Sequence, residues 1–228
     1  MLTLGFDTAT EVGTIGLVDD ERVIGEFSFG AEESQSERLL YSIDLLLKEA
    51  ELDVSDVNKI VVSRGPGSFT GLRIGISTAK GLARGLEVPL VGVPLTTCYY
   101  SKVENYPGTV YTLIKDRRDL VYFASFSGTG EKVGKEESIP VNEIEERVRN
   151  RTAELDYPVL MVGDAVPEHR DRLTEIEGVT LSRGEQNYPS GLQVAFLGQS
   201  MKAGEDELAS LEPLYAQRPI AEINWNEN

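Results

Sequence analysis

The chain has 228 residues, of which 40% are hydrophobic and 26% charged, and this composition is typical of a folded globular protein. Its 22 Lys and Arg residues against 38 Asp and Glu residues give a net charge of −16, which excludes a protein that binds nucleic acid mainly by neutralising phosphates. Any contact with nucleic acid must therefore use a local patch or a basic partner.

Residues that could build a disulfide or a metal site are scarce. Cys98 is the only cysteine and His169 the only histidine, so the chain alone forms neither an internal disulfide nor a Cys/His zinc cluster. No apolar run approaches the 18 or so residues of a membrane span, and no targeting signal is readable. These features predict a cytoplasmic protein with no metal of its own and no membrane contact.

The first hundred residues predict a mixed α/β unit that begins with three strands. Apolar residues alternate over 2–6, 12–18 and 23–27, as in an antiparallel meander. A capping box of Ser34 and Glu37 then precedes a helical apolar pattern. Two buried strands and a second helix complete the order βββαβαβ. The strands are expected at 59–63 and 89–93, and the helix, capped by Ser68 or Thr70, at 69–86.

A similar order starts again after residue 104. Strands are predicted at 110–114, 120–126, directly after Glu131 and at 158–163, with helices at 141–151 and 190–201. Two such halves suggest an internal duplication at the level of the fold. We therefore expect an N-terminal lobe over 1–104 and a C-terminal lobe over 105–228, with the last segment a candidate to pack back on the first lobe. A ligand is expected between the lobes.

Two turns at the ends of predicted strands are candidate phosphate or nucleotide sites. Asp7 and Thr8 follow the first strand, where backbone amides could bind a phosphate and Asp7 could bind a hydrated Mg²⁺. The alternative is that the two side chains only form hydrogen bonds within their own turn. Gly65, Gly67 and Ser68 lie in a strand-to-helix loop, where glycines let amides approach an anion. The loop matches neither the Walker pattern nor the dinucleotide fingerprint, so it indicates a tight turn more strongly than a nucleotide.

The helix at 69–86 carries a row of small residues at a spacing of four, formed by Gly71, Gly75, Ala79 and Ala83. Glycine inside a helix costs about 1 kcal/mol relative to alanine, so this row calls for close approach by another backbone. That backbone could belong to the chain's own sheet or to a helix of a partner protein, and both alternatives remain open. The same alternatives hold for a second row, Leu72, Ile76 and Ala83, and for the earlier helix, with Leu39, Leu40, Ile43 and Leu47.

Three segments closely resemble the bacterial TsaB family, also called YeaZ. They are Phe6-Asp7-Thr8-Ala9-Thr10, Ser36-Glu37-Arg38-Leu39-Leu40, and the block from Ser63 to Gly75 followed by Ala79-Lys80-Gly81-Leu82-Ala83. Weaker similarity at Gly163-Asp164 and at 213–222 extends the resemblance over the whole chain. Two positions depart from the family pattern. Gln35 stands where His is common, and Lys115-Asp116-Arg117 stands where Asp-Ala-Arg is common.

The resemblance implies the two-lobed α/β fold of actin, sugar kinases and heat-shock ATPases, each lobe being a mixed sheet of βββαβαβ type with flanking helices. It also implies a non-catalytic subunit required, with TsaD and TsaE, to transfer a threonylcarbamoyl group to the adenosine next to the anticodon, in tRNAs reading codons that begin with A. TsaD would carry the active site, and ATP and metal would be used by the partner subunits. This chain would contact the tRNA only indirectly, through the complex.

The resemblance places the contact with TsaD on the two helices of the first lobe. It assigns to this interface Leu39, Leu40, Ile43, Leu47, Gly71, Leu72, Gly75, Ile76, Ala79 and Ala83. On this assignment Gly75→Leu abolishes pairing and leaves the isolated chain folded, whereas unfolding of the variant would make the row part of the core. Exposed apolar helix faces also predict a homodimer when TsaD is absent.

Two functions of other classes stay open. The first is a small-molecule kinase or ATPase of the same fold that uses Asp7 and the glycine loop, and it needs an adenosine pocket and a general base that no sequence feature nominates. The second is a peptidase, an activity once inferred for relatives of this family. The chain offers neither a metal set nor a nucleophile set for it.

Overall fold

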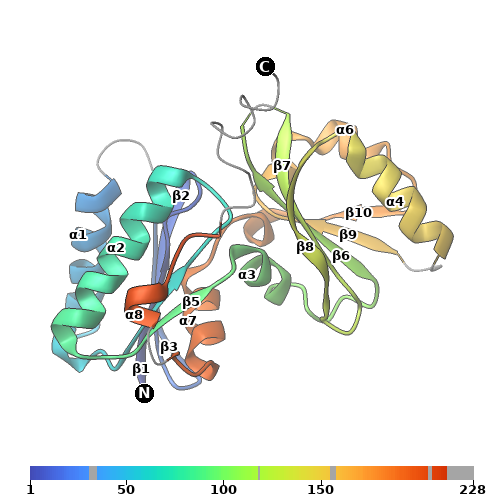
Figure 1. Cartoon of the computed structure of the whole chain (residues 1–228). Coiled ribbons are helices and arrows are strands. Elements are labelled where there is room, and N and C mark those ends of the chain that lie inside the picture. Colours follow the sequence, from blue (N-terminus) through green and yellow to red (C-terminus); the bar gives the residue numbers. More distant parts are fainter. Residues whose placement is uncertain (31–34, 118, 155–157, 205–206, 215–228) are drawn as a thin grey trace.

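The computed structural model describes residues 1–30, 35–117, 119–154, 158–204 and 207–214. These residues form two five-stranded mixed sheets, one in each lobe, with strand orders β3-β2-β1-β4-β5 and β10-β9-β6-β7-β8 (Figure 1). In each sheet the first three strands in the chain are antiparallel, and the two later strands, each of which comes after a helix, are parallel to the first. The predicted two-lobed α/β fold with a βββαβαβ order is therefore confirmed.

The N-terminal sheet begins with the predicted meander. Its strands are β1 (Leu2–Asp7), β2 (Val12–Asp19), β3 (Arg22–Gly30), β4 (Lys59–Ser63) and β5 (Leu90–Val93). β1 pairs in parallel with β4, and β4 with β5, so the turns that follow β1 and β4 meet at one edge of the sheet. This edge holds the candidate nucleotide residues.

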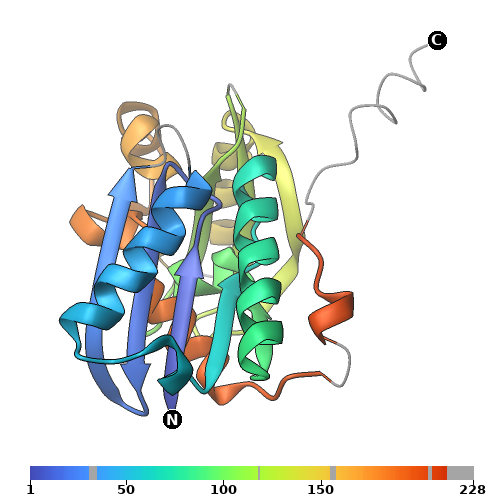
Figure 2. The same ribbon diagram turned by 90° about the vertical axis from the view of Figure 1, so that its left-hand side faces the viewer.

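Two helices lie side by side on the outer face of this sheet, as Figure 2 shows. They are α1 (Gln35–Glu49) and α2 (Phe69–Leu86). The side chain of Ser68 caps α2 by accepting a hydrogen bond from the amide of Gly71, as predicted, whereas the predicted cap residue Ser34 lies outside the described residues. α2 ends at Leu86 because Glu87 adopts the left-handed conformation.

The inner face of the N-terminal sheet is covered by a helix from the far end of the chain. This helix, α7 (Gly191–Ser200), packs closely on β1 and β2 because glycine removes the side chain at the contact. A Cβ added at Gly5 would overlap the backbone of Ala195, and one added at Gly16 would overlap that of Gly191. The approach of α7 therefore depends on these glycines.

The end of the described chain also belongs to the N-terminal lobe. α8 (Glu207–Ser210) lies beside α2, Leu211 is buried in the core of this lobe, and the amide of Leu214 donates to the carbonyl of Arg64 at 2.7 Å. α7 and residues 207–214 thus pack with the first lobe, whereas the division at residue 104 placed them in the second lobe, with the last segment as a candidate to pack back on the first. Residues 215–228 lie outside the described part of the chain.

The C-terminal lobe repeats the order of the first with shorter helices. Its elements are β6 (Thr109–Lys115), β7 (Leu120–Phe126), β8 (Lys132–Pro140), α4 (Glu143–Glu154), β9 (Val159–Val162), α5 (Ala165–Glu168), α6 (Arg170–Thr174) and β10 (Val179–Leu181). Short 3-10 helices at Val54–Asp56 and Gly184–Asn187 complete the described structure.

A continuous apolar core joins the two lobes. It contains side chains of both sheets together with α3 (Leu95–Ser101), a helix after β5 that the sequence analysis did not predict. Tyr99 of α3 is among the largest fully buried side chains. The lobes therefore meet through packed side chains as well as through polar groups. Among the described residues, no helix combines the length and apolarity needed to span a membrane.

Candidate functional site

The structure brings the five candidate nucleotide residues together, but it ties them to one another. The hydroxyl of Thr8 donates to the carbonyl of Gly71 at 2.7 Å, and the amide of Ser68 donates to the carbonyl of Ala9 at 2.7 Å. A Cβ added at Gly67 would overlap Ala9, so the glycine loop lies directly against the β1–β2 turn. The glycines thus serve a contact within the chain.

Three amides of this loop, those of Gly65, Ser68 and Gly71, already have partners within the chain. Besides Ser68, the amide of Gly65 donates to the hydroxyl of Ser63 at 3.3 Å, and that of Gly71 to the hydroxyl of Ser68 at 3.3 Å. An anion at a helix N-terminus needs free amides directed at it. The predicted phosphate contacts of the loop therefore compete with bonds that stabilise the fold.

Asp7 ends β1 and is completely buried. Its Oδ2 accepts from the amide of Ala9 at 3.2 Å, whereas its Oδ1 has no hydrogen-bond partner among the described residues. Burial raises the pKa of Asp7 to about 6, although the hydroxyl of Ser63 opposes this by stabilising the ionised form. A carboxyl of this kind binds a proton more readily than an exposed aspartate does.

A second acidic group, Asp164, faces the same junction from the C-terminal lobe. It follows β9, and its Oδ1 accepts from the amide of Lys115 at 2.9 Å. Burial raises the pKa of Asp164 to about 7; the bond from Lys115 opposes this shift, and the negative charge of Asp7 adds to it. The hydroxyl of Tyr99 is buried near both carboxyls and near the backbone of Asp164.

Lys115 bridges the lobes above this pair of acids. Its Nζ lies 3.0 Å from a carboxylate oxygen of Glu11, in the β1–β2 turn, and 3.2 Å from one of Glu168, in α5. Carboxylates therefore outnumber cations around this edge of the sheet, where a phosphate was expected to bind. In the sequence, Lys115 stands out only as a departure from a family pattern. Nothing in the sequence marks Glu11, Glu168 or Tyr99, because the proximity of these residues arises from the packing of the lobes.

The largest correction concerns the predicted partner interface. Nine of its ten residues are buried within the N-terminal lobe itself, namely Leu39, Ile43, Leu47, Gly71, Leu72, Gly75, Ile76, Ala79 and Ala83. A Cβ added at Gly75 would overlap Oγ1 of Thr8, and one at Gly71 would overlap the carbonyl of Thr8. Thr8 of the chain's own β1–β2 turn therefore approaches the first half of the small row, and these nine buried residues cannot line an exposed surface.

The exposed side of α1 and α2 carries a different set of residues, which we call the outer face. Its large apolar members are Leu40 (51% exposed) and Tyr41 (66%) near the middle of α1, and Phe69 (52%) at the start of α2. Along α2 follows an exposed row formed by Arg73, Ser77, Gly81 and Gly85. A Cβ added at Gly81 or Gly85 would meet no atom within 4 Å. Of the predicted interface residues, only Leu40 belongs to this face.

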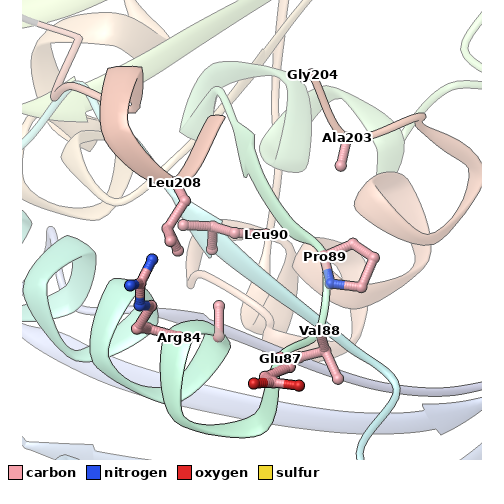
Figure 3. A pocket seen from close by; sticks show the side chains of 9 residues that line it. Arg84, Glu87, Val88, Pro89, Leu90, Ala203, Gly204 and Leu208 are labelled. Carbon is pink, nitrogen blue, oxygen red and sulfur yellow. The ribbon is translucent and has the colours of Figure 1, made fainter. Parts of the chain in front are cut away.

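A cavity of about 500 Å³ lies at the other end of α2 (Figure 3). It is lined by Ala83, Arg84, Glu87, Val88, Pro89, Leu90, Ala203, Gly204 and Leu208. Because Leu90 begins β5 and Asp7 ends the parallel strand β1, the cavity lies at the edge of the sheet opposite the acidic pair. One cation and one carboxylate over an apolar wall indicate no acid-base or metal chemistry. The described residues contain no group of three His, Cys, Asp or Glu residues that could hold a metal ion.

Known proteins resemble this chain in both sequence and structure. A family model described as "TsaD: tRNA N6-adenosine threonylcarbamoyltransferase" matches residues 30–225. The tRNA threonylcarbamoyladenosine biosynthesis protein TsaB of Escherichia coli is 30% identical over 97% of this chain and 96% of its own. The chain belongs to the TsaB family. TsaB of Bacillus subtilis is 28% identical over 100% of this chain and 99% of its own.

Structural comparison agrees with this membership. YeaZ from Pseudomonas aeruginosa has a TM-score of 0.74 and 25% sequence identity, covering 94% of this chain and 99% of its own. Membership in the family, which was inferred from the motifs around Asp7 and Gly67, is thus confirmed over nearly the whole chain.

Proposed function

We propose that this protein takes part in threonylcarbamoyladenosine synthesis in tRNA as a non-catalytic subunit, by pairing with a TsaD-like catalytic subunit through its outer face. The names of the E. coli and B. subtilis relatives supply the pathway. The observation that supports the mode of action is the outer face itself, where three large apolar side chains and an open row of small residues lie on two adjacent helices. Apolar patches of this kind mark protein–protein contacts.

The contacts at the lobe junction support a role without chemistry in this chain. Asp7 and Thr8 are buried, the glycine loop is bonded to the β1–β2 turn, and Lys115 joins the lobes through Glu11 and Glu168. A kinase or ATPase of this fold would need these groups open to a nucleotide. We therefore assign ATP, metal and the transfer step to TsaD-like and TsaE-like partners, with tRNA met through the complex.

Close helix packing explains why small residues would occupy an exposed row. Two helices approach to about 8 Å only where side chains between them are small, and Ser77, Gly81 and Gly85 leave that space on α2. The apolar residues Leu40, Tyr41 and Phe69 would then lie in the desolvated part of the contact, where most binding energy arises. The same face would form a homodimer in the absence of the partner.

The test mixes the chain with the TsaD-like protein of the same organism and measures masses by light scattering after size exclusion. A 1:1 complex is expected for the wild type. Gly81→Leu should remain folded, because no atom lies near its Cβ, and should weaken pairing at least 100-fold by blocking helix approach. Tyr41→Ser should weaken pairing about tenfold or more.

Tyr188→Ser is the matched control, because Tyr188 is also an exposed tyrosine (49%) but lies far from α1 in the sequence and on no helix. It should pair like the wild type. Full pairing by folded Gly81→Leu would contradict the proposed surface, and absence of any complex with the wild type would contradict the proposed function. In the second case, magnesium-dependent ATP turnover by the chain would favour a kinase or ATPase.

A further inference from the structure

Charge is distributed unevenly over the outer face. The chain carries a net charge of −16, yet α2 contains Arg73, Lys80 and Arg84 and no Asp or Glu along its 18 residues. A local excess of cations in an acidic protein creates a positive patch that attracts acidic groups. The patch lies on the helix whose exposed row was assigned above to the partner.

Two of these cations have no acidic partner in the described structure. Arg73 and Arg84 are exposed and form no ion pair with any described residue; Arg73 instead lies over the ring of Phe69, 3.8 Å from its centroid. Lys80 differs, because its Nζ donates to the carbonyl of Ala209 at 3.3 Å. The cations available to another molecule are therefore the two arginines.

The neighbouring helix α1 shows the opposite arrangement. Its Lys48 pairs with Asp44 at 2.6 Å, and its Arg38 donates to the carbonyl of Gly30 at 3.1 Å. The cations of α1 are thus bonded within the chain. Lys48 is thus neutralised by an acid and Arg38 is held by a backbone carbonyl, so the arginines of these two helices that have neither contact among the described residues are Arg73 and Arg84 of α2.

Arg73 and Arg84 are 11 residues apart, which is about three helical turns and about 16 Å along the axis of α2. Their Cα–Cβ bonds therefore leave the helix on nearly the same side, along which Ser77 and Gly81 also lie. From this side the guanidinium of Arg84 extends toward Leu208, beside the cavity that both residues line (Figure 3). A helix lying along this row would contact both arginines at once.

We propose that the subunit covering the outer face presents carboxylates to Arg73 and Arg84 from one helix, at two positions about three turns apart, with small residues between them. This inference rests on the proposed function and adds the chemistry of the partner. Arginine suits the role because its planar group binds a carboxylate through two parallel hydrogen bonds. The apolar residues beside it favour a protein partner over RNA phosphates, since an RNA backbone offers no apolar surface to Leu40 and Tyr41.

The experiment measures the dissociation constant of the chain and its TsaD-like partner by titration calorimetry at 50 and 500 mM salt. The wild-type complex should weaken at least tenfold at the higher salt. The double variant Arg73→Glu/Arg84→Glu should bind at least 100-fold more weakly at low salt, and Arg73→Gln/Arg84→Gln should lose most of the salt dependence. Replacing the two partner carboxylates by lysine should restore binding to the Glu variant.

The matched control is Arg172→Glu/Arg183→Glu, which makes the same change in net charge on two exposed arginines of the C-terminal lobe that form no ion pair with any described residue. It should bind the partner like the wild type. A complex that forms but responds to neither salt nor the Glu variant would overturn this inference and leave the proposed function standing. Absence of a wild-type complex would overturn both. Binding of tRNA by the isolated chain that is lost in the Glu variant would assign the patch to RNA instead.

Discussion

The two sides of α2 carry similar residues and have different environments. On the inner side Gly71, Gly75, Ala79 and Ala83 are buried against the chain itself, and on the outer side Ser77, Gly81 and Gly85 are exposed. Both rows are small and both repeat every four residues. Small residues at helical spacing therefore indicate close packing but do not tell which backbone approaches.

The residues next to each row distinguish the two sides of α2. The inner row lies beside Leu72 and Ile76, which are buried, whereas the outer row lies in line with Arg73. An apolar stripe about 100° wide normally faces the core, so a small row within it packs on the sheet. A small row aligned with an exposed cation is instead the candidate for another molecule.

The largest expected effect is on the inner row. Gly75→Leu should lower the free energy of unfolding by about 3 kcal/mol or more, because its Cβ alone would overlap Oγ1 of Thr8 and the β1–β2 turn would have to move. Urea unfolding followed by circular dichroism measures this change. A variant that unfolds like the wild type would show that the inner row is not tightly packed and would restore it as an interface candidate.

A second prediction concerns the junction that the inner row supports through Thr8. In the folded protein the pKa of Asp7 is about 6 and that of Asp164 about 7, both raised above the ordinary aspartate value by burial. The folded state therefore binds more protons than the unfolded state between about pH 4 and about pH 7. The contribution of the two acids to stability is greatest at low pH and is lost as the pH rises through the folded-state pKa values.

Urea unfolding between pH 5 and pH 8 tests this contribution. We expect Asp7→Asn/Asp164→Asn to lose stability less steeply than the wild type as the pH rises, and to be the more stable protein at pH 8 by roughly 1 to 3 kcal/mol. Glu145→Gln, on the exposed surface of α4, is the control and should follow the wild-type profile. Parallel profiles for the wild type and the double variant would show that the two acids titrate normally.

The sequence predicted the long helices and the described strands except β10, and it predicted the environments of side chains less well. Elements such as β4 and α2 follow from short apolar runs and from caps such as Ser68, which are local signals. α3 was missed because Thr96, Cys98 and Tyr99 have modest helix propensity, and the helix depends on burial between the lobes.

The sites depended on contacts that no local pattern contains. Asp7 was selected from its motif, but its burial, its unpartnered Oδ1 and its proximity to Asp164 arise from the packing of two lobes whose acids lie far apart in the sequence. The packing of α7 on the first lobe likewise required long-range contacts. The family was predictable because its motifs are local. The proposed interface was not, because it is defined by which side chains are exposed.

The smallest expected effect separates the two glycine rows without any partner. Gly81→Ala should raise the free energy of unfolding by about 0.5 to 1 kcal/mol, because alanine favours the helix and its Cβ would meet no atom within 4 Å. Gly75→Ala, which makes the same chemical change on the inner side, should lower it, because the gain in helix propensity is smaller than the cost of overlap with Thr8. Denaturant midpoints that shift in opposite directions would show that one helix uses glycine for its own core on one side and keeps it exposed on the other. A shift in the same direction for both would mean that the sheet tolerates a methyl group at Gly75, and the distinction between the rows would then rest on exposure alone.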